Sequence, residues 1–247
     1  MQPLIFYTIT ASMVLGQSGS ITSSVEYNSV KQIQLIPRYG PLPPTAIDDF
    51  PADFIPHCQK QVRRGPWRRR LGFISVSTVE PPPIILGSVA TKEILSCINI
   101  TFTPYFPHTA GIDWQFLRCR LKSQLQINTF YSTRRMTQMP ERSKSSNPTL
   151  RFKTEFVQLE GQELTASRKT TNHSCGPPFK FDFEMSASIP LPSLQSTEIL
   201  PTFIHRYAAR LYSLSMVIVL PDISHGSFEL EVPIQMVYES QTPGRVL

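Results

Sequence analysis

Two runs near the end of the chain, YSLSMVIVL at 212–220 and FELEVPIQMVY at 228–238, decide the fold class. In the second run every other residue is apolar from Phe228 to Tyr238, and the residues between them are mostly polar. Successive side chains of a strand leave opposite faces of a sheet, so this alternation is typical of a strand with one buried face. The segment between the runs contains Pro, Asp, Ser and Gly, which favour a turn. The sequence therefore predicts a long β-hairpin, with Pro233 at a sheet edge or a bulge because proline cannot donate to a ladder.

The same period-2 pattern recurs along the rest of the chain. Further strands are expected within 25–37, 71–79, 84–89, 91–103, 116–128, 150–159 and 181–189. The 23 prolines outnumber the 11 glycines and argue against long helices. Short strands at close spacing, without alternating helices or internal repeats, indicate a sandwich or a barrel. We predict an all-β fold, an antiparallel β-sandwich.

The simplest division of the 247 residues has one sandwich domain. It is expected to span 70–240, preceded at 21–69 by a strand and a proline-rich, basic arm. Residues 1–20 are an uncertain N-terminal segment, and 241–247 form a tail that is expected to fray.

Some features at the N-terminus and elsewhere suggest an alternative, a secreted module. The apolar run Leu4–Gly16 resembles a signal-peptide core, but no basic residue precedes Lys31. Sequons stand at Asn99 and Asn172. The four cysteines fit either two disulfides or a reduced chain, since their spacing matches no metal motif.

No arrangement of residues in the sequence indicates catalysis. The five histidines are scattered, and none has a second ligand at metal-binding spacing. Phosphate-binding glycine loops, nucleophile elbows and kinase signatures are absent from the sequence. We expect a protein that is not an enzyme and that needs no cofactor or metal.

Basic residues are the better candidates for function, because the formal net charge is +6. They gather at 60–70, along one side of the strand at 116–128, and in the polar loop that follows it. If these segments meet on one face, they form a docking patch for an anionic surface. The alternative is a set of solvated charges. Nucleic acid is not an expected partner, since none of its binding modules is present. The candidate contacts are Arg63, Arg64, Arg68, Arg69, Arg70, Arg118, Arg120, Lys122, Arg134 and Arg135.

A series of short motifs carries a family resemblance. In order they are EPPP at 80–83, Leu125 with TFYST at 129–133, PTF at 201–203, RLYSL at 210–214 and LEVPI at 230–234. Each motif is weak alone, but their order resembles fungal arrestin-like (α-arrestin-type) proteins. The resemblance covers about residues 70–240, the portion that corresponds to the C-terminal lobe of the family.

The resemblance implies an immunoglobulin-like sandwich that serves as a cytoplasmic adaptor, peripheral at membranes. Such adaptors engage the cytoplasmic tails of membrane transporters or receptors and recruit endocytic machinery or a ubiquitin ligase. Anionic lipid is a further expected partner. The chain departs from the family in two respects: it has room for one lobe only, and it lacks the Pro-Pro-x-Tyr motif that binds WW domains. Direct recruitment of a ligase is therefore not expected.

Overall fold

The computed structural model describes residues 7–15, 25–33, 45, 47–64, 69–86, 93–105, 117–142, 148–165, 167–168, 180–191, 199–223 and 226–238. These residues form strands, their connections and one short 3-10 helix, η1 (Ile47–Asp49). The chain divides into two compact units, Met1–Pro37 and Arg38–Leu247. Each unit is described separately below.

The first unit contains an antiparallel hairpin of β1 (Tyr7–Leu15) and β2 (Val25–Ile33). Its register pairs Tyr7 with Ile33 and Leu15 with Val25. The strand expected within 25–37 is thus present as β2. The run that resembles a signal-peptide core contains the whole of β1, where apolar residues alternate with threonine and serine from Tyr7 to Met13.

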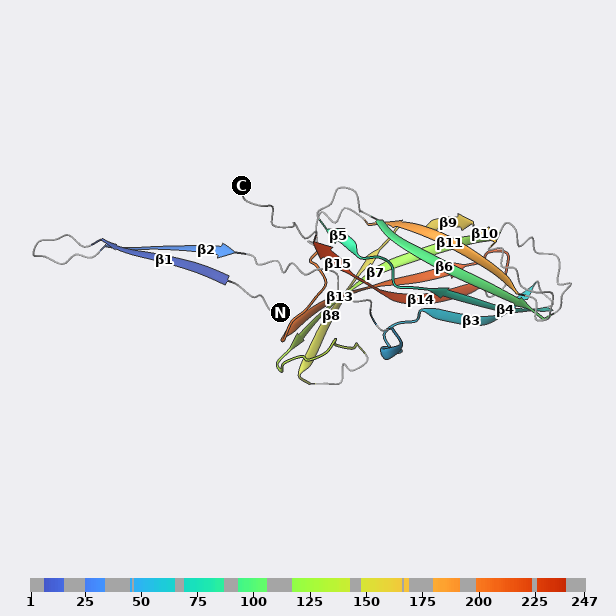
Figure 1. The fold of residues 1–247 in the computed structure, drawn as a ribbon, viewed down its shortest axis with the longest axis horizontal. Coiled ribbons are helices and arrows are strands. Elements are labelled where there is room, and N and C mark those ends of the chain that lie inside the picture. Colours follow the sequence, from blue (N-terminus) through green and yellow to red (C-terminus); the bar gives the residue numbers. More distant parts are fainter. Residues whose placement is uncertain are drawn as a thin grey trace, which may run out of the picture. The chain divides into compact units, whose positions relative to one another are not determined.

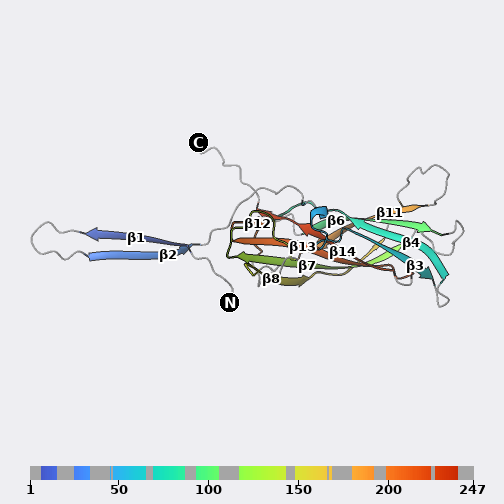
Figure 2. The ribbon, with the colours of Figure 1, turned by 90° about the horizontal axis from the view of Figure 1, so that it is seen from below.

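The second unit is built around a six-stranded sheet. At its centre β13 (Ala208–Val219) pairs with β7 (Arg118–Ser132). On one side β13 also pairs with β12 (Phe203–Ile204) and β14 (Ser227–Ile234). On the other side β7 pairs with β8 (Leu150–Gln158) and β9 (Gln162–Thr165). Figure 2 shows β13, β7 and β8 side by side.

A five-stranded antiparallel sheet forms the second layer (Figure 1). Its strand order is β10 (Ser167–Arg168), β11 (Phe181–Pro190), β6 (Glu93–Pro104), β4 (Arg69–Thr78) and β3 (His57–Arg64). A short parallel pair joins β5 (Ile84–Leu86) to β15 (Met236–Tyr238).

The core lies between the two sheets and draws alternate residues from each. Phe102 and Phe183 of one sheet, and Leu125, Leu214 and Phe228 of the other, are at most 1% exposed and belong to one apolar cluster. Burying such side chains is the main favourable term in folding. The predicted all-β, antiparallel sandwich is confirmed, and its immunoglobulin-like character stays a prediction.

The hairpin that decided the fold class is present as β13 and β14. Leu214 pairs with Val232 and Met216 with Leu230, so the apolar positions of both arms share the inner face. Pro233 belongs to β14, which pairs only with β13 among the described strands and therefore lies at an edge, as predicted. The second arm is interrupted at Gln235, and β15 continues beyond it toward β5.

The strand and proline-rich, basic arm predicted at 21–69 were expected to precede the sandwich, and the structure corrects the last part of this range. Residues 57–64 form β3 within the five-stranded sheet, and the unit boundary falls after Pro37. Lys60 explains the difference, because it occupies a position that alternation would reserve for an apolar residue. Its Nζ lies 5.7 Å from the centroid of the Phe228 ring and donates to the Ser227 carbonyl oxygen at 2.6 Å. The aliphatic stem thus covers apolar surface while the charge stays hydrated.

Candidate functional site

The first predicted basic group lies at the β3–β4 end of the five-stranded sheet. Arg63 pairs with Arg70 and Arg64 with Arg69, after a register shift at Val62 and Arg63. Arg70 is exposed and Arg63 is half-buried. The fifth residue of the group, Arg68, lies outside the described residues. Four of these five arginines are thus brought together across two strands.

The second predicted group lies on the outer face of the six-stranded sheet, where Arg118, Arg120 and Lys122 are exposed along β7. Acidic residues neutralise part of this stripe. The Arg118 guanidinium lies 3.8 Å from the Asp222 carboxylate, and Arg120 Nε lies 3.0 Å from Glu163 Oε1. Both pairs are exposed, so each contributes little to stability.

The third group, Arg134 and Arg135, follows the far end of β7. Since a strand rises about 3.3 Å per residue, Arg118 and Ser132 lie roughly 45 Å apart. The ten predicted contact residues therefore do not form one patch, and the third group lies at the opposite end of the sheet from Arg118.

Arg134 and Arg135 lie beside four basic residues that the sequence analysis did not select. Arg151 aligns with Tyr131 and Ala208 across the three strands β8, β7 and β13. Two residues further along, on the same face of the sheet, Lys153 aligns with Thr129 and Arg210. The Met136 amide donates to the Arg206 carbonyl oxygen at 2.7 Å, which holds the loop after β7 against the β12–β13 turn. We name this set the basic end; its members are Arg134, Arg135, Arg151, Lys153, Arg206 and Arg210.

The basic end is strongly positive and open to solvent. All its members are exposed except Arg210, which is half-buried and donates from Nε to the Tyr212 hydroxyl at 2.9 Å. Glu155 follows in the next row on the same face, where it aligns with Ile127 and Tyr212, and its carboxylate lies 2.7 Å from Lys153 Nζ. Tyr207 in the β12–β13 turn and Ile204 at the end of β12 are 52% and 38% exposed. Six cations are thus gathered here, Glu155 pairs with one of them, and an aromatic and an aliphatic side chain lie beside them.

Two segments cover the adjoining outer face of the six-stranded sheet, and a buried ion network joins them. The Arg142 amide donates to Asp53 Oδ2 at 2.8 Å, and its guanidinium also contacts the Asp53 carbonyl oxygen. Arg142 Nη1 lies 2.9 Å from both Glu231 Oε1 and Gln126 Oε1. The Arg142, Asp53 and Glu231 side chains are 19%, 6% and 18% exposed. This network attaches the segments at 47–56 and 133–142 to β7 and β14.

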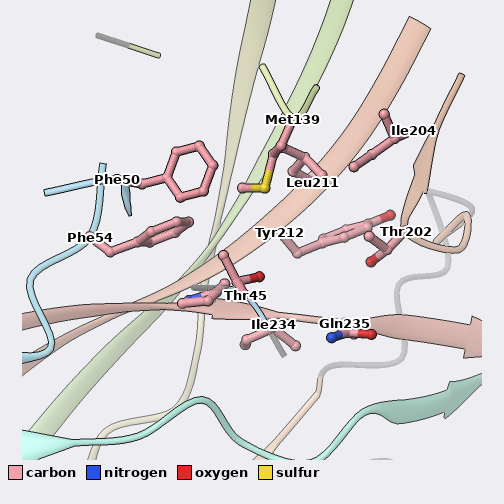
Figure 3. A pocket seen from close by; sticks show the side chains of 11 residues that line it. Thr45, Phe50, Phe54, Met139, Thr202, Ile204, Leu211, Tyr212, Ile234 and Gln235 are labelled. Carbon is pink, nitrogen blue, oxygen red and sulfur yellow. The ribbon is translucent and has the colours of Figure 1, made fainter. Parts of the chain in front are cut away.

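A largely apolar pocket of about 260 Å³ lies where these covering segments meet the sheet (Figure 3). Phe50, Phe54 and Met139 reach it from the covering segments, and Leu211 and Tyr212 come from β13. The remaining lining residues are Thr45, Thr202, Ile204, Pro233, Ile234 and Gln235. Burial raises the pKa of Tyr212 to about 12, and its hydroxyl donates to the Leu200 carbonyl oxygen at 2.6 Å. The pocket fits an uncharged apolar group.

The described cysteines, Cys58, Cys97 and Cys119, are free thiols, and Cys175 lies outside the described residues. Cys97 Sγ donates to Glu184 Oε1 at 3.1 Å. Burial raises the pKa of Cys119 from 9.0 to about 12.

We expect the raised pKa of Cys119 to protect this thiol in the folded protein, because the thiolate is the reactive form. Iodoacetamide at pH 8 should modify Cys58 well before Cys119, and denaturant should expose both; peptide mass spectrometry measures the two rates. The pKa of Cys119 is higher in the folded protein than in the unfolded chain. The contribution of this buried thiol to the free energy of unfolding is therefore complete below pH 9 and declines as the pH rises toward 12. Equal native rates for Cys58 and Cys119 would contradict the burial.

The described residues contain no group of three or more His, Cys, Asp or Glu side chains arranged to hold a metal ion. The same part of the chain contains no helix with the length and apolar character needed to cross a membrane. Asn99, the acceptor of the first sequon, is half-buried within β6, between β4 and β11. No protein-family model matches the sequence, and comparison with curated proteins gives no match.

Proposed function

We propose that the protein is a non-enzymatic adaptor that docks on anionic membrane through its basic end. The observation that carries the proposal is the gathering of six cationic side chains from β8, β13, the loop after β7 and the β12–β13 turn. These residues are far apart in sequence and share one end of a rigid sheet. Each Lys or Arg near an anionic leaflet contributes about 1 kcal/mol to membrane binding.

The side chains around the charges favour a membrane over a purely polar partner. Tyr207 follows Arg206 directly and is 52% exposed, and Ile204 ends β12 just before this turn. Tyrosine is suited to the headgroup region because it combines an apolar ring with a polar tip. A basic end with such residues at its tip has the composition expected of a peripheral membrane contact.

The adaptor part of the proposal rests on the resemblance to arrestin-like proteins. The cytoplasmic leaflet is the anionic one, and the free thiols of the described cysteines suit a reducing compartment. On this account the protein is cytoplasmic, and its sandwich binds the cytoplasmic tails of membrane transporters or receptors. Because the chain lacks a Pro-Pro-x-Tyr motif, any ubiquitin ligase must be recruited by another route.

Removing charge from the basic end is expected to weaken binding to anionic vesicles about 100-fold at low salt. The variant combines Arg134→Ala, Arg151→Ala and Arg206→Ala. Its matched control combines Arg118→Ala, Arg120→Ala and Lys122→Ala, which lowers the net charge by the same amount on β7. We expect the control to bind within about threefold of the wild type, since acids already neutralise two of its three positions.

Vesicle flotation measures both affinities, and circular dichroism checks that each variant is folded. Equal losses in the two variants would show that net charge alone drives binding. An unchanged affinity in the basic-end variant would place the membrane contact elsewhere.

A further inference from the structure

Strand β8 ends the six-stranded sheet, and no strand within the described ranges pairs with its outer edge. Among the described strands it pairs only with β7. Leu159 donates its amide to the Ser123 carbonyl oxygen, and Thr133 donates to that of Thr149. Odd-numbered residues on this stretch therefore bond toward β7. Because bonding direction alternates along an antiparallel strand, the backbone groups of Phe152, Thr154 and Phe156 point away from the sheet.

This open edge lacks two of the features that commonly protect an edge strand, a proline and a bulge, although charged side chains lie along its inner face. The nine residues of β8 include no proline, and no bulge interrupts their pairing with β7. Phe152 and Phe156 on the outer face are 37% and 59% exposed. A long edge with unpaired backbone groups and exposed aromatic side chains is a template for another strand.

The sequence of β8 is complementary to itself. In the stretch RFKTEFV at 151–157, Phe152 and Phe156 are equidistant from Thr154, and so are Lys153 and Glu155. We propose that β8 pairs with β8 of a second copy of this chain, antiparallel and centred on Thr154, to form a two-fold symmetric dimer. Phe152 then lies opposite the partner's Phe156, and Lys153 lies opposite the partner's Glu155.

Charge selects this register over its neighbours. The outward backbone groups belong to even-numbered residues, so only registers that pair even-numbered residues with one another can form hydrogen bonds between the two copies. The two such registers nearest to the one centred on Thr154 are centred on Lys153 and on Glu155. The first places Lys153 opposite its own copy, and the second does the same with Glu155. Like charges directly opposite one another destabilise a strand pair, whereas opposite charges and aromatic pairs stabilise it. The register centred on Thr154 is therefore favoured.

The dimer also has a geometric consequence for the basic end. The two-fold axis of an antiparallel strand pair is perpendicular to the sheet, so the same face of each subunit points the same way. Arg151, Lys153 and Arg210 share the inner face, and the dimer would present two such sets on one side. Two linked sites bind a surface more tightly than one. The dimer itself does not depend on the proposed membrane function.

Charge reversal and its rescue test the proposal on the full chain by sedimentation equilibrium. The wild type should show a concentration-dependent dimer. Lys153→Glu and Glu155→Lys should each raise the dimer dissociation constant at least about tenfold, since each replaces two attractive cross-strand pairs with repulsive ones. The double variant Lys153→Glu/Glu155→Lys restores both pairs and should return to within about threefold of the wild type.

A further variant tests the backbone of the edge. Thr154→Pro removes an outward amide and keeps the backbone hydrogen bonds to β7, losing only the side-chain bond from the Thr154 hydroxyl to Asn128 Oδ1, so it should leave a folded monomer. Circular dichroism monitors folding of every variant. A wild type that stays monomeric at about 100 µM would overturn the proposal, because no stable interface would then exist. A dimer that survives both single charge reversals unchanged would overturn it as well, since another surface must then form the interface.

Discussion

Replacing Gly72 with alanine is expected to lower the free energy of unfolding by about 3 kcal/mol or more. Gly72 lies in β4 with a φ of +154°, a conformation that residues with a side chain rarely adopt. An added Cβ would lie 2.7 Å from Pro104 Cα and would also collide with the Thr103 carbonyl oxygen. Both are backbone atoms of β6, which pairs with β4 at this position. The clash cannot be relieved by rotating a side chain, so the sheet itself must shift.

Urea unfolding of the wild type and Gly72→Ala measures this loss, with Gly161→Ala as the control. A Cβ at Gly161 would meet only the Leu121 carbonyl oxygen, at an ordinary 3.6 Å. Its replacement is expected to change stability by no more than about 1 kcal/mol. If Gly72→Ala were as stable as the control, the close approach of β4 and β6 would be wrong.

Replacing Arg142 with methionine is expected to cost about 3 to 5 kcal/mol of stability. Methionine retains much of the side-chain volume but removes the cation between Asp53 and Glu231. These two carboxylates are largely buried, and a buried charge that loses its counter-ion is poorly solvated. The loss should also loosen the covering segments, because the Arg142 guanidinium links Asp53 to the Gln126 side chain of β7.

Arg120→Met is the matched control for the ion network. Arg120 also contacts a carboxylate, that of Glu163, but the two side chains are 64% and 76% exposed. An exposed pair of this kind contributes about 1 kcal/mol at most. Thermal or urea unfolding should therefore separate the two variants by more than about 2 kcal/mol. Similar losses in both would mean that the Arg142 network is as hydrated as a surface pair.

The strands with clean alternation could be predicted from the sequence, because side-chain direction in a strand is a local property. The β13–β14 hairpin, β6, β7 and β11 each carry a largely apolar stripe, with Ser96 of β6 and Ser123 of β7 as polar exceptions. Strand β3 was missed since Lys60 interrupts its stripe, and only the distant Phe228 ring shows how the lysine is accommodated. Ser123 is a polar residue at an inward position of the alternation in β7, and it is buried with no partner for its hydroxyl among the described residues.

The candidate site was only partly predictable for a different reason. Arg134 and Arg135 were selected from local charge, but their neighbours Arg151 and Arg206 come from other segments. Bringing these together requires the register of β7 with β8 and β13, which depends on non-local pairing. Arg118 and Arg134 are only 16 residues apart in the sequence, but the extended strand β7 places them at opposite ends of the sheet. Arg142 belonged to a predicted basic loop, and its burial depends on contacts with Asp53 and Glu231.

The central claim, that the basic end docks on anionic membrane, is tested most directly by co-sedimentation of the unmodified chain with vesicles across a range of salt concentrations. The account predicts binding to vesicles that contain anionic lipid at low ionic strength. This binding should decline steeply as the Debye length falls from about 30 Å at 0.01 M salt to about 8 Å at 0.15 M. Neutral vesicles should retain little protein at any salt concentration. Absence of binding to anionic vesicles at low salt would contradict the account, as would binding that salt does not weaken.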